Sequence, residues 1–299
     1  MCYCCPPAIS ALFCLYVQSG CSQGSVAAAL TFFPPDPALY KFERYDKSGK
    51  LLPDEETDND QGNYEEEDDD GEDVELVEVV GSTGRVEPLE GRDKKKKNKK
   101  STKSPAQQLT ERVKQLRSRA KSRGVRDAED ARNGVSYNLV IDPRLIRPPI
   151  RGGTVEALKI PSKRNVHLAT VIYRVPTQNV TPHTKTIIYS HGNATDVGAM
   201  FNLQTMMVQS LNCNVVMYDY SGFGESGGVP SEASTYTDIR AVYDYVLDHV
   251  TDNPKNVILY GQSVGSGPSC HLAHKNDDLG GMILHSPFTS GMRVLTPSR

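Results

Sequence analysis

Charge is segregated along this chain, and the segregation limits where a hydrophobic core can form. Residues 54–75 are dense in carboxylates and residues 94–126 are dense in lysine and arginine, although the formal net charge is only −3. Blocks of this kind bury too little apolar surface to offset the entropy cost of ordering the backbone. We therefore predict a mostly disordered linker, acidic and then basic, over residues 45–135, and a core built from the C-terminal half.

The basic part of this linker permits two further interpretations. Residues 107–123 have the composition of a basic helix, and the lysine run at 94–100 has the composition of a nuclear-localisation or nucleic-acid patch. No RNA- or DNA-binding fold signature accompanies the lysines. We interpret the block as a solvated spacer and expect no nucleic-acid partner.

The N-terminus is rich in cysteine. Five of the seven cysteines lie within the first 21 residues: Cys2, Cys4, Cys5, Cys14 and Cys21. A disulfide framework needs a small turn-rich domain and zinc needs paired CxxC units, and neither pattern is present. Reversible S-acylation fits better, because these cysteines adjoin apolar residues and two or more acyl chains anchor a protein stably. We predict that residues 1–44 are a cysteine-rich, acylated membrane-targeting segment.

Two alternatives for the N-terminus stay open. Residues 8–17 have the length of the apolar region of a secretory signal peptide, but no cationic region precedes them, and ten apolar residues are too few to span a bilayer. Residues 25–40 add an apolar patch. This patch either lies at the membrane interface or docks on the globular domain as a short helix.

Strands alternate with helices from about residue 153 onward. Two β-rich runs, 154–160 and 166–175, are split by a turn at 161–165 and form a plausible hairpin. Further strands are predicted at 185–190, 214–220, 256–261 and 280–286, and helices at 231–250 and 264–275. This alternation implies right-handed crossovers and a parallel sheet covered on both faces. We predict a doubly wound α/β domain with a mostly parallel sheet over residues 136–299.

The stretch "VILYGQSVGSGP" places a serine between a strand and a helix. Gly261 and Gly265 flank Ser263 in a G-x-S-x-G pattern, which is typical of the nucleophile elbow of α/β-hydrolase folds. Glycine at both flanks removes Cβ atoms that would clash where strand and helix converge. The Val264 N–H lies in the first turn of the helix, where it can stabilise developing negative charge. Ser263 is therefore the candidate nucleophile and Val264 one oxyanion donor.

A second oxyanion donor is expected from the loop after an earlier strand. The stretch "YSHGNATD" closes such a strand, and we assign the Asn193 N–H, or failing that the Ala194 N–H, as the partner of Val264. His191 precedes Ser263 in the chain, whereas this fold has the order serine, acid, histidine, so we give His191 a structural role. The stretch "GFGESG" matches G-x-G-x-x-G but lacks the helix and acidic residue of a dinucleotide site. We expect no cofactor and no metal.

Several of these motifs together resemble one family. The stretches "HGNATDVG", "NVVMYDYSGFGESGG", "ILYGQSVGSGP" and "ILHSPFTSGMRV" are similar to those of the alpha/beta hydrolase domain-containing protein 17 family, and "CCPP" and "AAALTFFPPDP" resemble its N-terminus. The resemblance covers about residues 2–40 and 153–299. It implies a membrane-bound serine hydrolase that removes palmitate from cysteine thioesters, on the cytosolic face of the plasma membrane or of endosomes. Its substrates would be S-acylated membrane proteins.

The acid and histidine of such a hydrolase lie beyond the strand "GGMILHS", and the sequence ends at Arg299. Asp277, Asp278 and His285 come in the right order, but the aspartates enter the strand at its far end from Ser263. The apolar run at 281–285 is typical of a strand buried on both faces. We therefore expect an α/β-hydrolase domain that lacks its last strands, from a truncated product or splice form with little activity of its own. An inert, membrane-tethered binding module and a secreted lipase or esterase are the alternatives.

Overall fold

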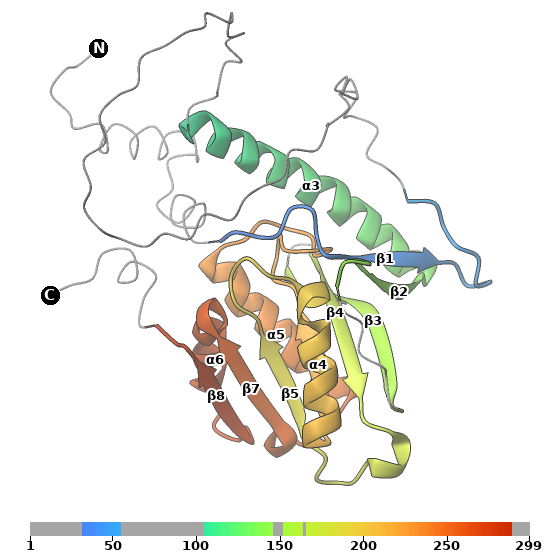
Figure 1. Ribbon diagram of the computed structural model, residues 1–299, viewed down its shortest axis with the longest axis vertical. Coiled ribbons are helices and arrows are strands. Elements are labelled where there is room, and N and C mark those ends of the chain that lie inside the picture. The colour runs from blue at the N-terminus through green and yellow to red at the C-terminus, as the bar shows by residue number, and fades with distance from the viewer. Residues whose placement is uncertain (1–31, 55–104, 146–151, 164–165, 289–299) are drawn as a thin grey trace, which may run out of the picture. The chain divides into compact units, whose positions relative to one another are not determined.

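The alternation of strands and helices is present in the computed structural model (Figure 1). It describes residues 32–54, 105–145, 152–163 and 166–288. The strands are β1 Tyr40–Tyr45, β2 Ser136–Ile141, β3 Thr154–Pro161, β4 His167–Arg174, β5 Thr186–Ser190, β6 Asn214–Tyr218, β7 Val257–Gln262 and β8 Gly281–His285. The helices are α3 Pro105–Asn133, α4 Val197–Leu211, α5 Glu232–His249 and α6 Ser266–Ala273, with 3-10 turns η2 Thr177–Asn179, η3 Pro254–Asn256 and η4 Ser263–Gly265.

The strands form one eight-stranded sheet in the order β1-β2-β3-β4-β6-β5-β7-β8. The predicted hairpin is confirmed, because β3 and β4 pair antiparallel from Thr154 opposite Arg174 to Pro161 opposite His167. Strands β6, β5, β7 and β8 pair in parallel, and the other pairings in the described sheet are antiparallel. The α/β class is confirmed, but the sheet is mixed rather than mostly parallel, since strands join it on the β4 side without crossover helices.

Each face of the sheet has its own apolar core. Helix α4 covers one face, where Phe201 and Val208 pack against Val171, Val215 and Met217. Helices α5 and α6 cover the opposite face, where a second cluster includes residues of β4, β5, β6 and β7 (Figure 1). Strands buried on both faces lose the polar alternation of a surface strand. This explains why β5 and β6 are buried at every position.

Side chains define where the helices begin. Asp196 caps α4 by accepting from the Ala199 N–H at 2.9 Å. Ser231 caps α5 in a capping box with Ser234, and this start agrees with the helix predicted from residue 231. Each cap satisfies backbone N–H groups that have no acceptor within the helix. Among the described helices, none combines the length and the apolar character that crossing a bilayer requires.

Two predicted regions differ from the structure: β1 lies mostly in the segment predicted over residues 1–44, and α3 lies in the linker predicted over residues 45–135. Residues 40–45 form β1, which pairs with β2, and the basic helix predicted at 107–123 is part of the longer α3. Asp127 and Asp130 of α3 are buried, each against a cation of the folded domain. The C-terminal half of α3 is therefore part of the domain, because its charges find buried partners that the sequence does not reveal. Residues 55–104 lie outside the described residues.

Strand β8 is the edge of the described sheet. It pairs with β7 on one side, and Met282, Ile283 and Leu284 are 40%, 44% and 37% exposed. This differs from the strand buried on both faces that its apolar sequence predicts. The exposure follows from the position of β8, because among the described residues no strand or helix covers its outer side.

Candidate active site

Ser263 lies at a sharp turn between a strand and a helix, as predicted. Strand β7 ends at Gln262, Ser263 opens η4, and α6 follows from Ser266. The Ser263 backbone has φ of +49°, a left-handed conformation that is rare for a residue with a side chain and that concentrates at functional sites. The residue is half-buried rather than packed inside the sheet. Ser263 is thus partly accessible at the carboxyl end of β7.

The two flanking glycines are required by close packing. A Cβ atom on Gly265 would lie 2.0 Å from the Ser190 carbonyl oxygen, and one on Gly261 would lie 2.6 Å from the Gly265 carbonyl oxygen. Backbone atoms at those distances have no room to move aside. The elbow therefore tolerates only glycine at both positions, as the G-x-S-x-G pattern predicts.

The oxyanion loop, residues 191–196, leaves the sheet beside the elbow. Strands β5 and β7 are parallel neighbours with Ser190 opposite Gly261, so the segments after both strands emerge at the same edge. A Cβ atom on Gly192 would be in ordinary contact with the Gln262 side chain, 3.7 Å from its Cδ, which places this loop against the residue before Ser263. Val264 lies in the first turn of η4, where N–H groups have no acceptor within the helix.

Asn193 is held in the oxyanion loop by its side chain. Its Oδ1 accepts from the Phe33 N–H at 2.8 Å and from the Ala194 N–H at 3.1 Å. Ala194 has φ of +54°, a second left-handed residue at this edge of the sheet. The structure thus brings Asn193, Val264 and Ser263 to one edge, with Ala194 N–H directed to Asn193 Oδ1.

His191 is buried and contacts groups of the scaffold. Its Nδ1 lies 2.8 Å from the Gly192 carbonyl oxygen and its Nε2 lies 3.2 Å from Asp219 Oδ1. The ring packs against Tyr220 and Phe223. These contacts agree with the structural role assigned to His191, since both ring nitrogens face groups other than the Ser263 hydroxyl.

Sequence reasoning did not identify Asp219, which joins three segments of the site. Its Oδ1 accepts from the Val197 N–H at 3.0 Å, and its Oδ2 accepts from the Tyr40 hydroxyl. Burial and the Asp219 carboxylate raise the pKa of Tyr40 well above its usual value, so this phenol stays a proton donor. The Asp in "YDY" at the end of a buried strand was the available signal.

The segment Phe32–Leu39 crosses the oxyanion loop and was also missed. Phe32 is buried edge-on against Phe223, and the Leu39 N–H donates to Asp196 Oδ2 at 2.7 Å. The described part of the apolar patch at 25–40 therefore packs on the domain. Residues 32–39 do so as irregular chain with bends and not as the short helix considered as the alternative to a membrane contact. Cys2, Cys4, Cys5, Cys14 and Cys21 lie outside the described residues.

The substitute triad of Asp277, Asp278 and His285 is not assembled. His285 Nδ1 lies 3.2 Å from the Tyr260 hydroxyl, and both aspartates lie in the turn before β8, at the far end of that strand from the elbow. Among the described residues, no histidine or carboxylate is hydrogen-bonded to the Ser263 hydroxyl. Nor do the described His, Cys, Asp and Glu side chains form a cluster that could hold a metal ion.

The loop after β6 is tied to α5 by a buried carboxyl group. Asp238 accepts from the Ser221 N–H at 2.8 Å, from the Ser221 hydroxyl at 2.9 Å and from the Ser162 hydroxyl at 3.2 Å. Burial nevertheless raises the pKa of Asp238 to about 6. The folded state therefore keeps a proton that the unfolded chain releases near its ordinary pKa of 3.8.

This proton makes stability depend on pH. Between pH 4 and 6 the unfolded state binds fewer protons than the folded state at Asp238. The contribution of Asp238 to stability therefore falls as pH rises, by up to about 3 kcal/mol, and is level above pH 6. Asp238→Asn should remove this contribution, so urea-unfolding measurements across this range should show a smaller loss of stability with rising pH than in the parent. Asp244→Asn, on the same helix with a side chain 58% exposed, should leave the decline intact. Equal pH profiles for the parent and Asp238→Asn would exclude the effect.

Comparison with known proteins defines the class to which this fold and site correspond. Residues 181–297 match the Hydrolase_4 family, described as Serine aminopeptidase, S33. This region contains the oxyanion loop, the elbow and β8, and the described domain has an α/β-hydrolase-like fold.

Curated relatives confirm the resemblance to one family within that class. Human alpha/beta hydrolase domain-containing protein 17B is 45% identical over 117 residues, covering 39% of this chain and 40% of the relative. Alpha/beta hydrolase domain-containing protein aho-3 of Caenorhabditis elegans is 42% identical over 135 residues, covering 45% and 39%. The mouse 17C protein is 44% identical over 112 residues, covering 38% and 35%. The chain thus spans about 40% of the length of the relatives it matches.

Solved structures with similar folds are more distant. An alpha-beta hydrolase from Vibrio vulnificus has a TM-score of 0.41 and 19% identity, covering 48% of this chain and 50% of that protein. The Pyrococcus furiosus esterase Pf2001 has a TM-score of 0.39 and 18% identity, covering 48% and 58%.

Proposed function

We propose that this protein is a serine hydrolase that cleaves fatty-acyl thioesters from cysteines of membrane proteins, with Ser263 as the nucleophile. The observation that carries the proposal is the left-handed Ser263 backbone at a glycine-flanked elbow beside the oxyanion loop. The acyl-thioester substrate is inferred from the resemblance to the alpha/beta hydrolase domain-containing protein 17 proteins. The N-terminal cysteines, once acylated, would hold the enzyme on the cytosolic face of the plasma membrane or of endosomes, near such substrates.

The proposed reaction proceeds by acyl transfer in two steps. The Ser263 hydroxyl attacks the acyl carbonyl carbon, and the Val264 and Asn193 N–H groups stabilise the oxygen anion that forms. The cysteine thiolate then leaves, and the acyl group stays bound to Ser263 as an ester. Water hydrolyses this ester and releases the fatty acid. A histidine and a carboxylate must take up and return the hydroxyl proton.

Chemical labelling tests the nucleophile. A fluorophosphonate probe reacts with an activated serine. We therefore expect it to label Ser263 in this chain or, more strongly, in a form that extends past Arg299. Ser263→Ala should remove the label completely. Ser210→Ala is the matched control, because Ser210 is exposed on α4, and it should keep full labelling.

Substrate comparison tests the reaction class. Turnover of an S-acyl cysteine peptide that Ser263→Ala abolishes would support the thioesterase. Turnover of peptide amides alone would replace it with the peptidase chemistry that the matched family description names. Absence of labelling in both the 299-residue chain and its extended form would contradict a serine hydrolase and favour an inert binding module.

A further inference from the structure

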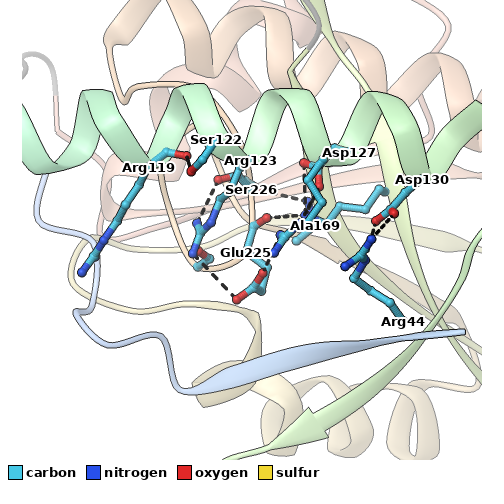
Figure 2. A network of polar contacts seen from close by, with 12 residues as sticks. Arg44, Arg119, Ser122, Arg123, Asp127, Asp130, Ala169, Glu225 and Ser226 are labelled. Carbon is cyan, nitrogen blue, oxygen red and sulfur yellow. Dashed lines mark hydrogen bonds and ion pairs between the residues drawn. The ribbon is translucent and has the colours of Figure 1, made fainter. Parts of the chain in front are cut away.

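The C-terminal half of helix α3 contacts the loop after β6 and strands β1 and β3. Arg123 donates to the Gly224 carbonyl oxygen and, at 3.2 Å, to that of Ser226, both in the loop after β6 (Figure 2). Asp127 pairs with the buried Lys159, and Asp130 pairs with Arg44 of β1. These contacts fix one face of the helix against the domain, so the opposite face has a defined direction.

The opposite face of α3 is cationic and has no described partner element over it. Lys121, Val125 and Arg132 are exposed on it, and Val125 is 64% exposed. Glu129 is also exposed and neighbours Val125 and Arg132 at helical spacing, so it borders this face. The outward face therefore combines two exposed cations, Lys121 and Arg132, with an apolar residue and one neighbouring acid, Glu129.

An open groove runs along this face. It has a volume of about 510 Å³, and Val125, Ala128 and Val166 line it together with Lys121 and Arg132. Apolar residues between two cations match a lipid interface, where the cations meet headgroup phosphates or carboxylates and the valines meet the upper acyl chains. A nucleic-acid surface would not need the exposed valine.

The described segment that follows the predicted acylated cysteines contacts α3. Asp36 of the segment Phe32–Leu39 pairs with Arg119 of α3 at 2.8 Å, and Pro34, Pro35 and Arg123 line a small cavity between the segment and the helix. Cys21 precedes Phe32 by eleven residues, which span at most about 40 Å of extended chain. An acyl chain on Cys21 therefore reaches a membrane only within that distance of α3.

We infer that the outward face of α3, centred on Lys121 and Arg132, binds the anionic lipid surface of a membrane. A single acyl chain gives only reversible anchoring, and a basic patch supplies the second attachment. Helix α3 and the segment Phe32–Leu39 both adjoin loops of the candidate active site. These two attachments therefore orient the carboxyl ends of the strands, where Ser263 lies, toward the bilayer. The inference shares the membrane location with the proposed function but does not depend on catalysis.

Vesicle flotation of the full chain, made in bacteria so that it carries no acyl groups, tests the inference. We expect binding to vesicles of 70% phosphatidylcholine and 30% phosphatidylserine and much weaker binding to pure phosphatidylcholine. Each cation near an anionic surface contributes about fivefold to partitioning, so Lys121→Gln with Arg132→Gln should lower the partition coefficient about 30-fold. High salt should also release the protein, since it screens exposed charges.

Two controls separate this face from overall charge and from catalysis. Lys255→Gln with Lys275→Gln removes two exposed charges at η3 and just after α6, and should retain binding. Ser263→Ala should also bind as the parent does, so failure of the hydrolase proposal would leave this result unaffected. Equal binding by the Lys121 and Arg132 double variant would overturn the inference. Binding to duplex RNA in place of vesicles would overturn it in favour of a nucleic-acid partner.

Discussion

Gly265→Ala is expected to destabilise the protein by about 3 kcal/mol or more and to abolish labelling of Ser263. Gly265 has φ of −64° and ψ of −14°, which alanine adopts freely, so the effect is steric alone. Its new Cβ atom would lie 2.0 Å from the Ser190 carbonyl oxygen and 2.6 Å from the carbonyl carbon. Either α6 moves away from β5, or the Ser263 turn opens. Urea unfolding and fluorophosphonate labelling measure the two consequences.

Gly267→Ala is the matched control for this substitution. Gly267 lies two residues further along, inside α6, and a Cβ atom there would meet nothing within 4 Å. Alanine should stabilise the helix by about 0.5–1 kcal/mol and leave labelling unchanged. If Gly265→Ala instead kept full labelling and stability, the close contact between the elbow and β5 would be wrong.

The elbow could be predicted from sequence because its causes are local. A buried strand, a serine between two glycines and a helix of small residues fall within twelve residues, from Val257 to Pro268. The helix Glu232–His249 was found for the same reason, since its cap at Ser231 and its apolar spacing are both local. Helix α4 has the same kind of cap at Asp196 but was not predicted, because its uncharged sequence lacks a clear polar face.

The segments that surround the site could not be predicted, because long-range contacts position them. Phe33 reaches Asn193 across 160 residues, and Tyr40 reaches Asp219 across 179. Composition placed α3 in a charged linker, yet Asp127 and Asp130 are buried by partners in β3 and β1. Charge content predicts solvent exposure only where no such partner exists.

Lys159 is the buried cation that pairs with Asp127 and attaches α3 to the domain. Lys159→Met is expected to lower the free energy of unfolding by about 3–5 kcal/mol, because removing one partner leaves a buried charge without compensation. Lys159 Nζ lies 3.1 Å from Asp127 Oδ1 and donates to the Glu225 carbonyl oxygen at 2.5 Å. Burial lowers the pKa of Lys159, which shows that its charge depends on these partners. Urea unfolding measures the loss.

A double variant tests whether the loss of stability comes from the unpaired charge of Asp127. Lys159→Met with Asp127→Leu removes both buried charges and should recover part of the stability that Lys159→Met loses, whereas independent roles would make the two losses add. Glu156→Gln breaks the more exposed pair with Arg174, whose atoms are 3.4 Å apart, and should change stability by less than about 1 kcal/mol. If Lys159→Met left stability unchanged, α3 would be held by its other contacts, including those of Arg119, Arg123 and Asp130. The loop after β6 would then be positioned without the buried pair.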